Sequence, residues 1–391
     1  MDRRLAVYEP YLGVMPTWKV PLADVVVSDD DIAAVAETYR SGWLSMGPQT
    51  DAFESALAAY TGAEHALAVT NGTAALHLIC EAAGLKAGDE VVVPSLTFVA
   101  TVNAVAYTGA TPVFADIAGL DRPWLSAASA AAAVTDRTKA IMTMSYGGHP
   151  GEVQALKALC DERGLLLLED AAHGIGGRSG DLHLGRTGAA GAFSFFSNKN
   201  LAIGEGGAIV TDDDELAARM RLLRSHGMTT LSWDRHRGHA TGYDVVALGF
   251  NYRIDEPRAA LASRRLARLD AETVQRAAIV ARYRELLAAT ARLVPALPDV
   301  TGEQPAHHLF VVVLDADIDR AAFRAALAAQ GIQTSMHYPP VHHFSMYRDA
   351  PRGPLPETDA YGARTVTLPL FAHMTEAQQD LVLAAVNSAL R

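Results

Sequence analysis

Lys199 is the residue of this 391-residue sequence with the clearest chemical potential. It lies in the run FSFFSNKNLAIGEGG, between two apolar stretches and beside Gly204, Gly206 and Gly207. A short, glycine-supported connection can hold a lysine inside a site, where desolvation lowers the pKa of its amine and favours Schiff-base formation. Taken by itself, such a pattern more often marks an ordinary solvated lysine.

A second chemical segment ends the run LLLLEDAAH with two adjacent carboxylates, Glu169 and Asp170. A carboxylate at the mouth of a fully apolar strand contacts little water and usually has a cationic partner. Only one of the two can point into a site. An N-cap for the following turn is the alternative explanation.

A phosphate site is favoured by the run VTNGTAAL, in which a strand ends and Asn71-Gly72 turn the chain into a helix near Thr73. Backbone N–H groups and the dipole at a helix N-terminus attract anions. Ser194 lies five residues before Lys199, where its hydroxyl could reach the same phosphate. A plain strand–helix turn remains the simpler alternative.

Polar residues also gather between about residues 232 and 256. The run LGFNYRIDE carries Asn251, Tyr252 and Arg253, and the preceding SWDRHRGHATGY carries aromatic and cationic side chains. Arginines bind diphosphates and an indole stacks on a flat ring. We expect substrate contacts here, although a solvated loop is the alternative; the candidates are Trp233, Arg235, Arg237, Tyr252, Arg253 and, further on, His337.

Several classes of site and partner are disfavoured. The net charge of −11 argues against a nucleic-acid-binding surface. The run HGIGG at 173–177 lacks the full spacing of a dinucleotide-binding fingerprint. The spacings of His307, His308, His337, His342 and His343 do not match a common metal-ligand pattern, so we expect no metal.

The order of the predicted elements indicates an α/β protein. From about residue 65 to 211, apolar strands without period-2 alternation follow one another with helices between them, which favours a mainly parallel, buried sheet. Near the N-terminus, Ser28 and Asp31 have the spacing of a helix capping box, and Ile32, Val35 and Tyr39 would form the apolar stripe of that helix. Late in the chain the pattern changes to a long helical stretch from about 257 to 291, followed by a strand at 308–314 and two helices. We therefore predict an N-terminal arm (1–22), a large domain (23–260) and a smaller α+β domain (261–391).

The two cysteines, Cys80 and Cys160, lie in apolar stretches and are interpreted as core thiols. We find neither a signal peptide pattern nor an apolar run of membrane-spanning length. The sequence therefore predicts a cytoplasmic protein that does not contact membranes.

Taken together, these segments resemble the DegT-type (DegT/DnrJ/StrS) family of sugar aminotransferases. The similarity runs through nearly the whole chain, in SGWLSMGPQTDAFE, TNGTAALHL, GDEVVVPSLTFVATVNAV, TGATPVFADI, YGGHPGEVQALKALCDERGLLLLEDAAH, FSFFSNKNLAIGEGGAIVT, LGFNYRIDE and HYPPVHH. The resemblance implies pyridoxal phosphate (PLP) as cofactor and fold type I, which is like that of aspartate aminotransferase, with a seven-stranded sheet in the large domain.

The resemblance also implies roles at matching positions. Lys199 would form the Schiff base and move protons, and Asp170 would pair with the protonated ring nitrogen, which makes the ring an electron sink. The remaining cofactor contacts would be Phe98 on the ring face, His173 near the ring hydroxyl, and Gly72, Thr73, Ser194 and Asn251 of the partner subunit at the phosphate. The site would thus be shared within a homodimer.

The implied reaction transfers an amino group from glutamate to a nucleotide-linked keto-sugar, expected to be dTDP-linked and aminated at carbon 4. Such reactions serve deoxyaminosugar and antibiotic biosynthesis. Two alternatives stay open: a keto-cyclitol aminotransferase of aminoglycoside assembly, and a PLP-binding regulatory module. His173, where a glutamine is common, and Pro257-Arg258, in place of an aliphatic residue and a glutamine, depart from the family pattern. A histidine replaces the lysine in a sugar-dehydrating branch, so Lys199 argues against dehydration.

Overall fold

The computed structural model describes residues 18–230 and 242–391. Its main sheet has seven strands in the order β1–β9–β8–β5–β4–β2–β3. All neighbours are parallel except β9, which runs antiparallel to β1 and β8. This confirms the predicted mainly parallel sheet of an α/β protein. The strands are β1 (His65–Val69), β2 (Glu90–Pro94), β3 (Thr111–Ala115), β4 (Thr138–Met144), β5 (Leu166–Asp170), β8 (Ala190–Ser194) and β9 (Gly207–Thr211).

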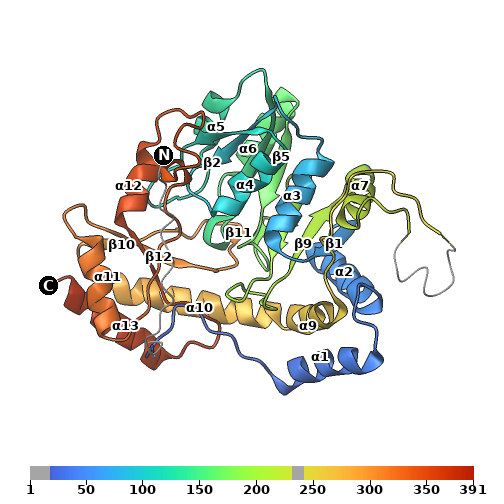
Figure 1. Ribbon diagram of the computed structural model, residues 1–391. Coiled ribbons are helices and arrows are strands. Elements are labelled where there is room, and N and C mark those ends of the chain that lie inside the picture. Colours follow the sequence, from blue (N-terminus) through green and yellow to red (C-terminus); the bar gives the residue numbers. More distant parts are fainter. Residues whose placement is uncertain (1–17, 231–241) are drawn as a thin grey trace, which may run out of the picture.

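Helices bury the main sheet, which explains why its strands are continuous apolar runs. Three of them, α3 (Gly72–Ala82), α4 (Val99–Tyr107) and α7 (Asp214–Arg224), share one apolar cluster with the sheet. Two others, α5 (Ala127–Ala133) and α6 (Val153–Arg163), share another. Figure 1 shows α3 and α4 in front of the strands. The strands that these helices cover are mainly parallel, so they end at one common edge.

The C-terminal part is built on a second, antiparallel sheet in the order β10–β12–β13. Outside this sheet, Val20 forms an isolated parallel bridge with Ile332 and is fully buried. This end of the predicted arm therefore packs on the C-terminal part. Residues 1–17 of the arm lie outside the described residues. The elements are β10 (Leu293–Pro295), β12 (Phe310–Leu314), β13 (Thr365–Leu368), α10 (Leu269–Leu287), α11 (Arg320–Ala329), α12 (Pro356–Arg364) and α13 (Glu376–Ala389).

The remaining elements are short or lie at the N-terminal side. A small sheet joins β11 (Glu303–Gln304), β6 (Arg178–Ser179) and β7 (Leu182–His183). The 3₁₀ turns η1 (Tyr146–Gly148) and η2 (Val341–His343) follow β4 and precede α12. The last helices are α1 (Asp29–Ser41), α2 (Pro48–Thr61) and α9 (Glu256–Leu266). Within the described ranges, we find no helix with the length and apolar character that crossing a membrane requires.

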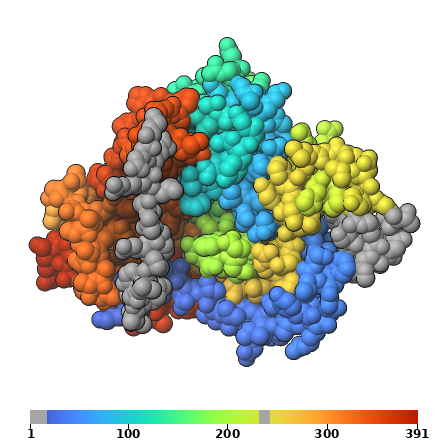
Figure 2. All heavy atoms as spheres, in the orientation of Figure 1, coloured from blue at the N-terminus to red at the C-terminus, as the bar shows by residue number. Residues whose placement is uncertain are grey.

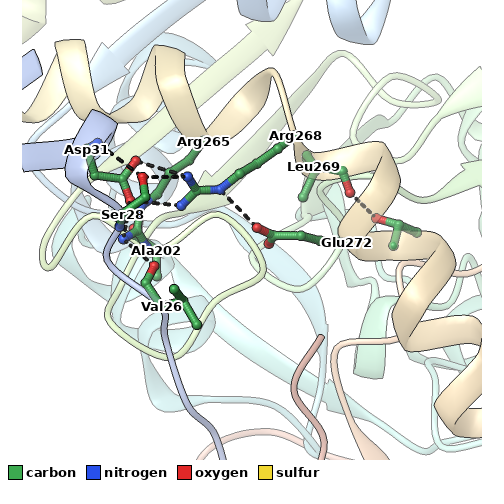
Figure 3. A network of polar contacts seen from close by, with 9 residues as sticks. Val26, Ser28, Asp31, Ala202, Arg265, Arg268, Leu269 and Glu272 are labelled. Atoms are coloured by element: carbon green, nitrogen blue, oxygen red, sulfur yellow. Dashed lines mark hydrogen bonds and ion pairs between the residues drawn. The ribbon is translucent and has the colours of Figure 1, made fainter. Parts of the chain in front are cut away.

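Helix α1 begins with the predicted capping box of Ser28 and Asp31, but its predicted apolar stripe is wrong. Ile32 and Tyr39 are exposed, whereas Asp31 is only 1% exposed. Its carboxylate accepts hydrogen bonds from Arg268 at 2.8 Å and Arg265 at 3.2 Å (Figure 3). Because the partner face of α9 and the start of α10 carry arginines, α1 turns its acidic face inward.

The predicted helical stretch from 257 to 291 is two helices rather than one. It breaks between Leu266 and Leu269, where Arg268 reaches from the turn to Asp31 and to Glu272 (Figure 3). Local periodicity could not show this break, because the contacts that stabilise it involve residue 31. The predicted domain boundary at residue 260 falls inside α9 and stays a prediction. The sequence did not predict α7, α12, β10 or β13, nor the small sheet of β11, β6 and β7.

Candidate active site

A cavity of about 660 Å³ opens where several strands of the main sheet end. Met144, Asp170 and Ser194, the last residues of β4, β5 and β8, line it. Parallel strands deliver their following loops to one edge, which is the usual ligand position in such sheets. Figure 2 shows the light-green surface of the segment around residue 200 between blue-green and orange-red parts of the chain.

Lys199 lies in the connection between β8 and β9 and lines this cavity. The residue is only partly covered, but its amine lies deep enough that burial lowers its pKa to about 8. The nearby Asp170 carboxylate opposes this shift and favours the charged amine. A larger fraction of this amine is therefore neutral, and able to act as nucleophile or base, than in a solvated lysine.

Asp170 is held firmly on the same side of the cavity. Its carboxylate accepts from the Thr101 hydroxyl at 2.6 Å and from the Ala172 backbone N–H at 3.0 Å. Burial raises the pKa of Asp170, while these donors and Lys199 favour its ionised form. Its neighbour Glu169 instead accepts from the N–H groups of Gly185 and Gly188. Of the two carboxylates, Asp170 alone lines the cavity.

A cradle suited to an anion lies at the start of α3. Gly72 and Thr73 are its first residues, so their N–H groups have no carbonyl partner within the helix. The Asn71 side chain caps the helix by accepting from Ala74 N–H at 2.8 Å. An added Cβ at Gly72 would lie only 2.8 Å from Cβ of Ser194. Backbone and the Ser194 hydroxyl thus approach each other closely because position 72 has no side chain.

Buried His173 and partly buried Tyr338 form a pair in the cavity wall. The Gly147 N–H donates to His173 Nδ1 at 3.3 Å, and the Tyr338 hydroxyl lies 3.0 Å from Nε2. Burial holds the pKa of His173 well below its usual value. We infer a neutral ring protonated on Nε2, since Nδ1 accepts from the backbone. Phe98, half-exposed, packs its ring against Tyr338 with centroids 5.6 Å apart.

The structure places most of the predicted site residues around this cavity. The lining includes Gly72, Thr73, Phe98, Asp170, His173, Ser194, Lys199, Tyr252 and His337. Asn251 and Arg253 do not line it: Asn251 is exposed and pairs with Ser225. Trp233, Arg235 and Arg237 lie outside the described residues.

Several groups of the site were missed from the sequence, among them Tyr338, which lines the cavity, and Thr101, which bonds Asp170 without lining it. Thr101 lies on α4, three residues after Phe98, which caps that helix. Tyr338 follows His337 in the run HYPP, whose density of aromatic and ring residues was the available signal. Neither contact could be assigned from local spacing, because Thr101 is 69 residues from Asp170 and Tyr338 is 165 residues from His173.

One histidine group does come together outside the cavity. Nε2 of His342 and Nε2 of His343 lie 3.0 and 2.9 Å from the same oxygen of Asp359. The spacing along the sequence could not show this group, because Asp359 comes from the next helix. The expectation that the protein has no metal stays a prediction.

The donor set of the main cavity fits PLP. Backbone N–H groups at the start of α3, with Ser194, suit a phosphate; Asp170 suits a protonated ring nitrogen; and Lys199 suits a carbonyl carbon. The close approach at Gly72 is a further observation in favour, because any side chain there would fill the cradle. The volume of about 660 Å³ also leaves room for a substrate beside the cofactor.

Comparison with known proteins gives consistent results. The model of the DegT/DnrJ/EryC1/StrS aminotransferase family matches residues 26–387. The aminotransferase TlmJ from Streptoalloteichus hindustanus is 32% identical, with a TM-score of 0.89 over 95% of this chain and 98% of that one. DesV of S. venezuelae is 36% identical, with a TM-score of 0.84 over 92% and 94%. The putative sugar aminotransferase Spr1654 from Streptococcus pneumoniae, in its PLP form, is 24% identical and shares the fold, with a TM-score of 0.88 over 95% and 98%.

Proposed function

Since the chain belongs to the DegT/DnrJ/EryC1/StrS aminotransferase family and is a PLP-dependent enzyme, we propose that Lys199 binds the cofactor covalently and Asp170 faces its ring nitrogen. The observation that carries this proposal is a lysine with a pKa lowered to about 8 in the same cavity as a carboxylate held by two donors. When bound, PLP supplies an electron sink for the electron pair left on the substrate carbon.

The residues of the chain divide the remaining work. The Lys199 amine would remove the proton from the substrate carbon as a general base and deliver it to the cofactor carbon as a general acid. Asp170 holds a proton at the ring nitrogen, and Thr101 with Ala172 N–H keeps its carboxylate oriented. Gly72, Thr73 and Ser194 bind the phosphate. The neutral His173 donates near the ring hydroxyl.

The proposed substrate is a nucleotide-linked keto-sugar, dTDP-linked with the ketone at carbon 4, and the proposed amino donor is glutamate. Sugar aminotransferase activity is the function of the family, and two similar structures support it. The finer choice rests on the family resemblance and on the cationic run that contains Arg235 and Arg237. A natural-product aminosugar pathway is the corresponding biological setting, and we propose a cytoplasmic location.

The reverse half-reaction distinguishes the substrates. We expect dTDP-4-amino sugars to convert the cofactor to its aminated form, seen as loss of its visible absorption band, while dTDP-3-amino sugars and an aminocyclitol leave the band in place. Conversion by the aminocyclitol alone would replace the nucleotide-sugar proposal with the keto-cyclitol alternative. Reaction of carbon-3 amines without carbon-4 amines would keep the substrate class and correct the position.

A homodimer with shared sites is the proposed assembly. Asn251 is exposed and outside the cavity of its own chain, so it is available to a partner subunit. Large apolar side chains are exposed in the same stretch, with exposed fractions of 54% for Val245, 56% for Val246 and 92% for Leu248. Exposed apolar groups of this kind favour a protein interface, and two-fold dimers are the commonest closed assembly.

Mixing two inactive proteins tests this assembly. We expect Lys199→Ala and Asn251→Ala subunits to regain activity after exchange, because one site of each mixed dimer would contain both residues intact. The activity should rise well above that of either parent, up to one working site per mixed dimer. Demonstrated subunit exchange without recovery would contradict the shared site, and exchange with wild-type subunits is the control.

A further inference from the structure

A second cavity, of about 260 Å³, has Asn198 and Lys199 in common with the main cavity. Its other walls come from residues 23–26, from α9 and α10, and from the loop after β13. Several of its lining residues are cationic, among them Arg265, Arg268 and Arg276. It therefore borders the connection that carries the reactive lysine, and its cationic residues outnumber its two carboxylates, Asp24 and Glu272.

Most of these charges have partners within the described chain. Figure 3 shows Arg268 between Asp31 and Glu272, with nitrogen–oxygen distances of 2.8 and 3.0 Å. Arg265 also bonds Asp31, at 3.2 Å, and donates to the Ala202 carbonyl. His373 lies 3.0 Å from Asp24. The charges of these groups are therefore compensated within the protein and do not require an anionic ligand.

Arg276 is the exception in this lining. Its side chain is only 6% exposed, yet no carboxylate of residues 18–230 or 242–391 forms an ion pair with it. Its guanidinium makes one long hydrogen bond, from Nη1 to the Leu370 carbonyl at 3.4 Å, and its buried Nε has no acceptor among the described residues. Burial lowers the pKa of Arg276 to about 10, with Glu272 opposing the shift. Buried charges are normally paired, and this guanidinium has a nearby carboxylate in Glu272 but no carboxylate bonded to it in the described residues.

We propose that the second cavity is a carboxylate-binding subsite in which Arg276 binds a carboxylate group of the amino donor. The proposal rests on the proposed aminotransferase function. A guanidinium can form two parallel hydrogen bonds with a carboxylate. Asn198 and Lys199 line both cavities, so the subsite shares a wall with the cavity that contains the reactive lysine. The site thus takes an amino donor that carries a carboxylate, such as glutamate.

Glutarate, a dicarboxylate without an amino or keto group, is the probe for binding. We expect calorimetry to show glutarate binding to the holoenzyme, and Arg276→Gln to weaken it about 10- to 100-fold, the loss of charge-assisted hydrogen bonds. Arg276→Lys keeps the charge without the planar fork and should fall between the two. The matched control is Arg282→Gln on the same helix, whose partner is Asp380 outside the cavity, and it should bind glutarate like the wild type.

Kinetics decide whether the bound carboxylate belongs to the amino donor or to a separate effector. We expect glutarate to compete with glutamate. We also expect Arg276→Gln to raise the KM for glutamate with little change in kcat, because the lost interaction would stabilise the bound substrate and the transition state equally. Non-competitive inhibition by glutarate would overturn the donor assignment, as would unchanged glutarate affinity in both Arg276 variants.

Two further measurements separate this inference from other failures. Because the charge of Arg276 has no anionic partner, Arg276→Gln should not lower the unfolding midpoint, whereas a purely structural arginine would. Borohydride should still fix the cofactor to Lys199 in this variant. If the cofactor fails to attach in the wild type, the proposed function is wrong; if it attaches and Arg276→Gln handles glutamate normally, only the subsite is wrong.

Discussion

A Lys199→Ala enzyme is expected to lose transamination by about 10²- to 10⁴-fold from the missing proton transfer alone. Loss of the covalent bond to the cofactor adds to this effect, because the amine is both the attachment point and the base. Among the lysines, Lys199 combines a place in the cavity with a pKa lowered by burial. The loss should appear in kcat, measured with saturating glutamate and acceptor.

Attachment of the cofactor provides a second measurement on the same residue. Borohydride reduction followed by peptide mass analysis should find the cofactor on Lys199 in the wild type and on no residue in Lys199→Ala. The control is Lys157→Ala, which removes an exposed lysine paired with Asp161 and should label like the wild type. A reducible adduct at wild-type level in Lys199→Ala would overturn the assignment.

The pH dependence of attachment follows from the lowered pKa. Only the neutral amine is a nucleophile, so the rate of attachment to apoenzyme should rise about tenfold per pH unit below about 8 and level off above it. An ordinary lysine would level off only near pH 10.4. Stopped-flow absorbance across pH 6.5 to 9.5 distinguishes these two profiles, and a continued rise to the highest pH would contradict the buried amine.

An Asp170→Asn enzyme is expected to lose on the order of 100-fold or more in kcat, the usual cost of removing a preorganised electrostatic partner. Asparagine keeps the shape and can still accept from the Thr101 hydroxyl, but it has no charge to stabilise a protonated ring nitrogen. The loss should therefore fall on the chemical step, so single-turnover rates with glutamate should drop while the cofactor remains bound.

The neighbouring carboxylate provides the control for this change. Glu169→Gln removes a charge one residue away, but Glu169 bonds to Gly185 and Gly188 N–H groups and does not line the cavity. Provided its circular dichroism spectrum shows a folded protein, its turnover should stay near that of the wild type. Near-normal turnover of Asp170→Asn would show that another group protonates the ring.

Some features of this protein were determined by the sequence alone, because their signals are local. Continuous apolar runs such as 165–168 can be stable only when both faces of a strand are covered, so they predicted the buried parallel sheet. Parallel strands end at one edge, so Asp170, Ser194 and the residues after β1 were predicted to lie near one site. The capping box of Ser28 and Asp31 was equally readable, since both partners lie within four residues.

Other features were decided only by tertiary structure, because their partners are far apart in the chain. Asp31 faces inward because arginines more than 230 residues later need its charge, which reverses the orientation that the apolar stripe of α1 predicted. Thr101 bonds Asp170, and Tyr338 bonds His173. Neither pairing produces a periodic pattern in the sequence. Arg276 looks like any helical arginine in the sequence; only the packing of α10 shows that its side chain is buried in the wall of a cavity that Lys199 also lines, without an ion pair in the described chain.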